Sequence, residues 1–180
     1  MAGTDSATLE GTQAATSPPD EWDLRCELWH RLWIAYRYHR RREAWFDRLD
    51  KATTAISVLL GATILAKAVD DWLPFAASVI AGLGFLALVF NYSSRRVLHN
   101  ELAVKLMLLI ADIEGLPAND LTMEQVATWK KRYAAEVSTK EPPTLKALAM
   151  HCEYEQAVAV ANPKLPPKVP GWRLIFANVF

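Results

Sequence analysis

Residues 72–94 read WLPFAASVIAGLGFLALVFNYSS, 23 positions without a charged side chain, and two arginines follow immediately. An α-helix rises about 1.5 Å per residue, so residues 75–94 alone would extend roughly 30 Å, the thickness of a bilayer's hydrocarbon core. A buried helix of a soluble bundle typically needs only about 10 to 14 apolar residues. The stretch therefore predicts a transmembrane helix at residues 73–94.

A second uncharged stretch, ATTAISVLLGATILA, lies just upstream at residues 52–66. It reaches a full span only when it continues to residue 69, with the Lys67 side chain extending to the membrane surface. The short connection that follows contains two aspartates and Pro74, which favour a turn and the start of a helix. We therefore predict a first crossing at residues 52–69 and a transmembrane hairpin.

Basic residues gather at the ends of the predicted hairpin that lie away from its turn. Six lysines and arginines lie in the 15 residues before residue 52 and three in the 15 after residue 94, whereas the turn contains only Lys67. Cytoplasmic flanks of membrane helices carry such an excess of positive charge. Both termini are therefore predicted to face the cytoplasm.

The rest of the chain predicts helices. Residues 1–20 are small and polar and predict a disordered tail, without the basic start and apolar core of a signal peptide. Residues 21–51 predict an amphipathic cytosolic helix that runs into the first crossing, and residues 95–161 predict cytosolic helices. Residues 162–180 form a proline-rich tail with an apolar C-terminus. The predicted fold class is an all-α membrane protein, in which a two-helix transmembrane hairpin is continuous with a cytosolic helical bundle and the protein is oligomeric.

Within residues 95–161 the spacing of apolar residues predicts three helices. The first continues from the second crossing to a stop at Gly115, the second runs from a Thr122 cap to about Val137, and the third spans residues 143–161. Asp20 is expected to cap the long N-terminal helix.

Motifs for catalysis, metals and cofactors are not found in the sequence. The two cysteines are far apart and without metal-ligand spacing, and no glycine-rich phosphate loop is present. His99 is expected to form a capping or interhelical hydrogen bond and not to act in catalysis. No acidic residue lies within residues 73–94, which disfavours transport by alternating access. We expect no enzyme activity, no metal and no cofactor.

Basic side chains are densest next to the predicted membrane boundary. One interpretation is an anchor to anionic lipid headgroups. The other is a phosphate site, in which several protomers form a cationic vestibule for a nucleotide or short nucleic acid. The phosphate candidates are Arg37, His39, Arg40, Arg41, Arg42, Arg95, Arg96, Lys130, Lys131 and Arg132. Tyr36, Tyr38 and Trp129 are candidates for base stacking, with packing as the alternative.

Small and polar residues are scattered through the predicted crossings. The Ser78-x-x-x-Gly82 pattern is typical of helix association in lipid. Ser57, Thr63 and Asn91 are candidates to line a water path. Such a path needs an oligomer, because two helices cannot enclose it.

Three features together resemble the SLATT family over about residues 22–172: the run YRYHRRR at residues 36–42, two closely spaced crossings, and the run SRRVLH at residues 94–99. The resemblance implies a two-crossing effector of anti-phage defence in the bacterial inner membrane. Such an effector oligomerises and permeabilises the membrane when a nucleotide-type signal changes. Without an appended sensing domain, the chain is similar to stand-alone members, including the Hailong type, that act beside a nucleotidyltransferase and whose signal is a short DNA oligomer.

The resulting functional prediction is an oligomeric membrane pore, gated through its cytosolic helices by a nucleotide or short oligonucleotide and causing depolarisation or membrane disruption. Its expected partners are the lipid bilayer, further copies of the chain and the signal made by a nucleotidyltransferase, with no stable binding of duplex nucleic acid. The alternative is a non-conducting membrane scaffold that recruits a soluble partner. A third interpretation is a small membrane enzyme, but the sequence indicates no titratable residue that would act in catalysis.

Overall fold

The computed structural model describes residues 20–65, 73–170 and 173, and these residues form helices and connecting segments without a β-strand. The all-helical part of the prediction is confirmed. The elements in chain order are α1 (Glu21–Leu65), α2 (Leu73–Phe90), α3 (Tyr92–Gly115), a 3-10 turn (Ala118–Asp120), α4 (Met123–Tyr133) with a π-helical turn (Ala134–Ser138), and α5 (Lys146–Ala159).

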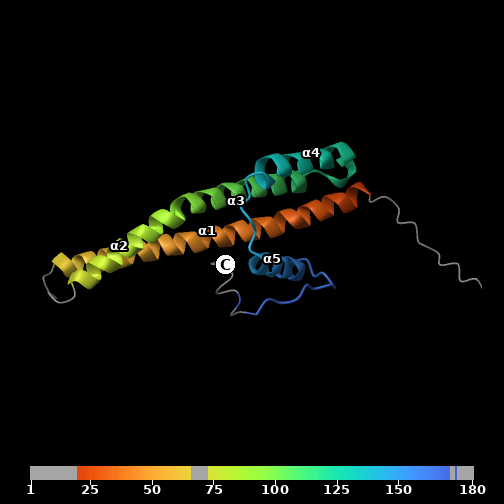
Figure 1. Ribbon diagram of the computed structural model, residues 1–180. Helices are drawn as coiled ribbons and strands as arrows, with labels where there is room; N and C mark the ends of the chain where they lie inside the picture. Colours follow the sequence, from red (N-terminus) through yellow and green to blue (C-terminus); the bar gives the residue numbers. More distant parts are fainter. Residues whose placement is uncertain (1–19, 66–72, 171–172, 174–180) are drawn as a thin grey trace, which may run out of the picture.

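Helix α1 is the longest element, with 45 residues and no interruption between the predicted cytosolic helix and the described part of the first apolar stretch. Asp20 caps it as expected, because its carboxylate accepts a 2.7 Å hydrogen bond from the N–H of Trp22. A helix of this length extends about 67 Å. Figure 1 shows α2 and α3 following one another along α1 in the opposite direction.

The main core lies between α1 and the C-terminal half of α3. Leu32 of α1 and Leu106 and Ile110 of α3 are fully buried there, and α4 covers them with Val126 and Trp129. The buried positions of α3 recur every three or four residues, which places them on one face of the helix. This face is the apolar stripe that the sequence predicts.

Helix α5 packs on α1 away from α4 (Figure 1). It begins at Lys146, three residues after the predicted start at Pro143. The reason is local: prolines disfavour helical backbone in the residue before them, so the Glu141-Pro142-Pro143 run stays extended. The N–H of Leu145 instead donates a 3.1 Å hydrogen bond to the Tyr38 hydroxyl, which fixes the start of α5 against α1.

The structure departs from the expected continuous helix at Asn91. Its backbone is left-handed, with φ 45° and ψ 54°, and its side chain accepts a hydrogen bond from the N–H of Ser94. Asparagine tolerates this conformation better than most residues and is also a preferred N-cap. Asn91 therefore ends α2 and starts α3, a role that its candidacy as a pore-lining residue did not anticipate.

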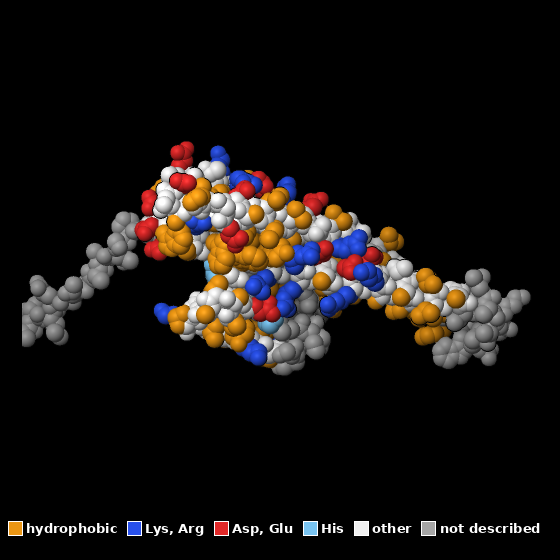
Figure 2. Space-filling model, turned by 180° about the vertical axis from the view of Figure 1, so that it is seen from behind, with side chains coloured by type: hydrophobic (Ala, Val, Ile, Leu, Met, Phe, Trp, Pro, Cys, Tyr) orange, Lys and Arg blue, Asp and Glu red, His pale blue; other side chains and the backbone are white. Residues whose placement is uncertain are grey.

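One described helical stretch, Leu73–Gly115, is long and apolar enough to cross a membrane, and only 6 % of its most apolar 18-residue window is buried in the protein. Figure 2 shows charged side chains over the broad part of the molecule, next to apolar ones, whereas the described part of the tapered end carries apolar and uncharged side chains. The first crossing, whose residues 66–69 lie outside the described chain, stays a prediction. So do the hairpin, the two-crossing topology and the identity of the membrane.

Replacing Leu106 with alanine tests the α1–α3 core. Leu106 is fully buried, so its truncation should lower the free energy of unfolding by about 2–5 kcal/mol, because apolar burial is lost and a cavity is left behind. Leu108 is 57 % exposed on the same helix, so Leu108→Ala should change stability by no more than about 0.5 kcal/mol. Thermal unfolding in detergent, followed by circular dichroism, measures both. Equal losses would contradict this core.

Asn91 supports a second prediction. Asn91→Ala should destabilise the protein by roughly 1–3 kcal/mol, because alanine removes the side-chain cap and tolerates a left-handed backbone less well than asparagine does. Asn91→Gly should lower the free energy of unfolding by only a few tenths of a kcal/mol, since glycine adopts this conformation freely and is accepted at N-caps. Asn100→Ala, at an exposed position inside α3, is the control. The same unfolding measurement decides, and alanine and glycine variants of equal stability would rule out the strained cap.

Candidate functional site

A pair of buried histidines joins α1 to α3 near the middle of the molecule. His39 is 0 % exposed and His99 3 %, and their Nδ1 atoms lie 2.9 Å apart, so one ring donates a hydrogen bond to the other. The Nε2 atom of His39 is 3.4 Å from the Glu141 carboxylate, and the ring of His99 stacks on Phe46. The interhelical hydrogen bond predicted for His99 is confirmed.

His99 is held in its neutral form. Burial, followed by the positive charges of His39, Arg42 and Arg95, lowers the pKa of His99 to about 3. At neutral pH its ring therefore carries a single proton, which lies on Nδ1 or on Nε2. When His39 donates to Nδ1 of His99, that proton is on Nε2.

Next to this pair is a cavity of about 550 Å³ between α1, α3 and the extended segment before α5, which we call the α1–α3 cavity. Its polar lining consists of Tyr38, Arg42, Arg95 and His99, and its apolar lining of Leu98, Pro142, Pro143 and Leu145. A smaller pocket of about 330 Å³ shares Arg42 and Arg95 and lies towards α2. Its other walls are Trp45, Phe46, Leu49, Phe90 and Tyr92.

The two arginines differ in their surroundings. Arg42 is 8 % exposed and its guanidinium lies 4.6 Å from the centre of the Phe46 ring, a cation–π contact. Burial lowers the pKa of Arg42, while Tyr38 raises it and Arg95 lowers it. Even so, an arginine in a protein stays charged. Burial also raises the pKa of Tyr38, so its hydroxyl remains protonated and keeps a hydrogen to donate.

Besides His39, which lies against Glu141, five of the phosphate candidates are engaged by acceptors of their own chain. Arg37 donates to the Gln156 side chain, and the other four pair with carboxylates. These pairs are Arg40 with Glu43, Arg41 with Glu155, Arg96 with Asp47, and Arg132 with Asp112 and Glu136.

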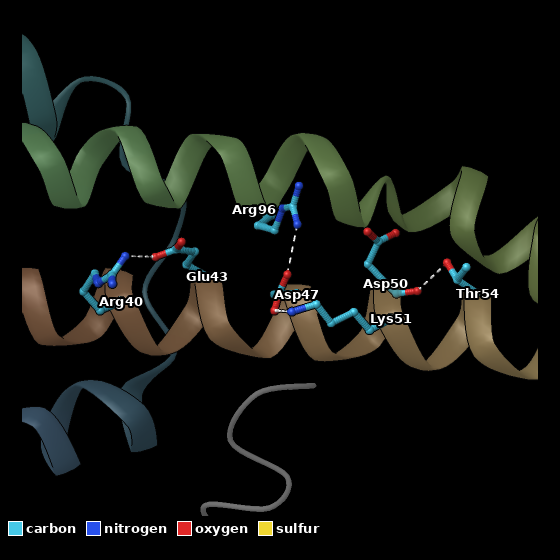
Figure 3. A network of polar contacts seen from close by, with 7 residues as sticks. All are labelled: Arg40, Glu43, Asp47, Asp50, Lys51, Thr54 and Arg96. Carbon is cyan, nitrogen blue, oxygen red and sulfur yellow. Dashed lines mark hydrogen bonds and ion pairs between the residues drawn. The ribbon is translucent and has the colours of Figure 1, made fainter.

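Figure 3 shows part of this network along α1 and α3. Asp47 lies between Lys51, at 2.6 Å, and Arg96, at 2.9 Å, and these hydrogen bonds lower the pKa of its carboxyl group. The Thr54 hydroxyl donates a 2.9 Å hydrogen bond to the Asp50 carbonyl one turn away. The polar contacts therefore continue to the point where the apolar part of α1 begins.

The basic residues of α4 lie far from the α1–α3 cavity within one protomer. Arg132 pairs with Asp112, which follows His99 by 13 positions on α3 and so lies about 20 Å further along the helix. Lys130 and Lys131 are exposed on α4. The structure thus brings His39, Arg42 and Arg95 together but does not bring the α4 cations to them.

The aromatic and pore candidates have mostly structural contacts. Trp129 is in the core, Tyr38 forms the cavity wall, and Tyr36 packs edge-on against Trp33 at 5.5 Å. Ser57 is half-buried on α1. Thr63 also lies in α1, and its side chain is outside the described part of the structure.

Together these observations define an all-helical protein with an apolar helix long enough to cross a membrane and a buried, cationic polar site beside it. Comparisons of the chain with protein-family models, with curated proteins and with solved structures find no match. Among the described residues, no group of three or more histidine, cysteine, aspartate or glutamate side chains could hold a metal ion.

The neutral His99 predicts a pH dependence. Because the folded-state pKa of about 3 lies below the ordinary 6.5, the unfolded chain binds more protons between these values. Stability is therefore full above pH 6.5 and should fall by roughly 1–2 kcal/mol between pH 7.5 and pH 5. His99→Gln should flatten this dependence, whereas His30→Gln, which changes a histidine outside the pair, should keep it. Unfolding midpoints across this pH range provide the measurement, and an unchanged slope in His99→Gln would refute the assignment.

Proposed function

We propose that the protein is an oligomeric membrane pore whose opening is controlled through its cytosolic helices. The observation that carries this proposal is the continuity of α1. One 45-residue helix runs from the α4-covered core, past the buried histidine pair, into the apolar stretch that begins at Ala52. A rigid helix transmits a tilt or rotation from one end to the other, because its backbone hydrogen bonds keep it from bending freely.

Oligomerisation follows from the geometry of a pore. Two helices cannot enclose water, so several copies would have to surround a common path. Gly61, Gly82 and Gly84 support this arrangement, since a Cβ atom added at any of them would meet no atom within 4 Å. Small residues left open in this way allow helices of neighbouring protomers to approach closely in lipid.

The resemblance to the SLATT family supplies the biological context of the proposal. On that basis the pore belongs to bacterial anti-phage defence and acts in the inner membrane. A nucleotide or short oligonucleotide made by a partner nucleotidyltransferase is the signal. The buried cationic site at the middle of α1 is where such a signal would act.

A non-conducting scaffold is the second candidate, and the ion pairs favour it. Arginines that are already paired with Glu43, Glu155 and Asp47 provide little free charge for a ligand. In a scaffold these pairs would simply hold the cytosolic helices in place for a soluble partner. The difference between the two candidates is conduction.

Ion flux from liposomes that contain the full-length protein separates them. A pore should release ions or dye, and the release should change when short oligoadenylates, short DNA oligomers or cyclic nucleotides are added. Protein-free liposomes are the control. Absence of flux with and without these ligands would reject the pore and leave the scaffold.

Lys51→Pro tests whether α1 carries the signal. Lys51 is exposed and, among the described residues, pairs with Asp47, so its side chain contributes little. Proline inside a helix, by contrast, removes a hydrogen bond and kinks the axis. Lys51→Pro should abolish the ligand-dependent change in flux, whereas Lys51→Ala should retain at least about half of it. Flotation with liposomes checks membrane insertion. Full gating in the proline variant would show that the signal does not pass along α1.

A further inference from the structure

We infer that the α1–α3 cavity binds a phosphate-bearing anion, held mainly by the guanidinium groups of Arg42 and Arg95. This inference rests on the proposed function for its role as the gating site, and its chemistry is argued from the cavity alone. The sequence placed ten candidates over the whole predicted cytosolic part, whereas the structure brings two arginines, a tyrosine and a histidine together around one cavity between α1 and α3.

Every polar side chain that lines the cavity can donate a hydrogen bond. Arg42 and Arg95 provide guanidinium groups. The Tyr38 hydroxyl accepts from the N–H of Leu145 and so has its own hydrogen left for a ligand. His99 offers Nε2–H in the arrangement in which His39 donates to its Nδ1, and an anion in the cavity would favour that arrangement. Donors that converge without acceptors match the oxygens of a phosphate group.

The charges around the cavity have the same sign. No carboxylate of the described residues lines it, and Arg95 forms no ion pair with an acidic side chain of the described chain. Glu141 is an acidic residue near the cavity: it precedes Pro142 of the lining, its carboxylate lies 3.4 Å from Nε2 of His39, and, besides burial, its charge contributes to the raised pKa of Tyr38. Arg42 and Arg95 repel each other, as the effect of Arg95 on Arg42 shows. An anion between them would relieve this repulsion.

The size of the cavity fits a small ligand. Its volume of about 550 Å³ is within the range of roughly 300–1,000 Å³ that is usual for ligand pockets. The adjoining pocket adds aromatic walls next to the same two arginines. A nucleotide could therefore place its phosphate between the arginines and its base against Trp45 or Tyr92. An anionic lipid could place its headgroup at the same position, because this pocket lies beside the apolar helix α2.

Binding to the full-length protein in phosphatidylcholine nanodiscs tests the inference, with inorganic phosphate, adenosine monophosphate and adenosine as probes in calorimetry. A parallel set of nanodiscs contains phosphatidylglycerol, and its effect on the unfolding midpoint reports a lipid ligand. Binding of phosphate and the monophosphate, but not of adenosine, supports a soluble ligand. Stabilisation by phosphatidylglycerol alone supports a headgroup. Either result supports the phosphate site and shows whether the bound phosphate group belongs to a soluble ligand or to a lipid.

Arg95→Gln is the decisive variant, because Arg95 is exposed and its replacement should leave the fold intact. It should weaken the observed binding by about tenfold or more, or abolish the lipid stabilisation. Arg48→Gln removes the same charge from an exposed position of α1 that lines neither cavity and should change binding by less than about twofold.

Three results would overturn the inference: no binding of either phosphate probe together with no lipid effect, adenosine binding as tightly as its monophosphate, or equal losses in Arg48→Gln and Arg95→Gln. These measurements do not involve conduction. Binding without flux would retain the phosphate site and reject the pore, whereas gated flux without binding would retain the pore and reject this site.

Discussion

The packing of α3 against α1 is the contact on which the rest of the structure depends. Leu32, Leu106 and Ile110 exclude water along this contact, and Arg25 closes its end by donating to the carbonyl groups of Ile113 and Leu116 at 2.6 and 3.0 Å. Ile113 lies in the last turn of α3 and Leu116 is its C-cap, where carbonyl groups have no intrahelical partner. Both α4 and α5 are then added to a pair of helices that is already defined, one on each side of α1.

Among the described residues, the buried polar side chains of this contact gather at one level, where His39, His99 and Arg42 lie together. Burying such groups costs free energy unless each finds a partner, so an apolar trio of the same size would give a more stable interface. The contacts present reduce this cost: the two histidines bond to each other, His39 faces Glu141, and Arg42 lies over Phe46. A costly buried polar cluster beside a cavity is typical of a site and uncommon in a core.

The sequence predicted the helices because their signals are local. The Thr122 cap, the stop at Gly115 and the apolar face of α3 follow from residue types and from spacings of three and four residues, and the structure contains all of them. The set of residues that lines the cavity could not be predicted from such local spacings. Arg42, Arg95 and Pro142 come from three separated segments, and only the packing of α1 against α3 and the extended proline run brings them together. The pairing of Arg41 with Glu155, 114 positions away, was equally invisible to spacing.

For the proposed pore, the position of the α1–α3 cavity would have an energetic consequence for gating. Reversing a two-state equilibrium from about 1:99 to 99:1 requires a ligand to favour one state by roughly 5.5 kcal/mol. Charge-assisted hydrogen bonds contribute about 1.5–3 kcal/mol each, so two guanidinium contacts supply about 3–6 kcal/mol if both form in only one state. Arg42 is on α1 and Arg95 is on α3, and both contacts therefore form only when the two helices are correctly spaced. A ligand held by both arginines would fix the distance between α1, which continues into the apolar stretch, and α3, which Asn91 joins to α2. In the proposed pore, a change in that distance would open or close the water path.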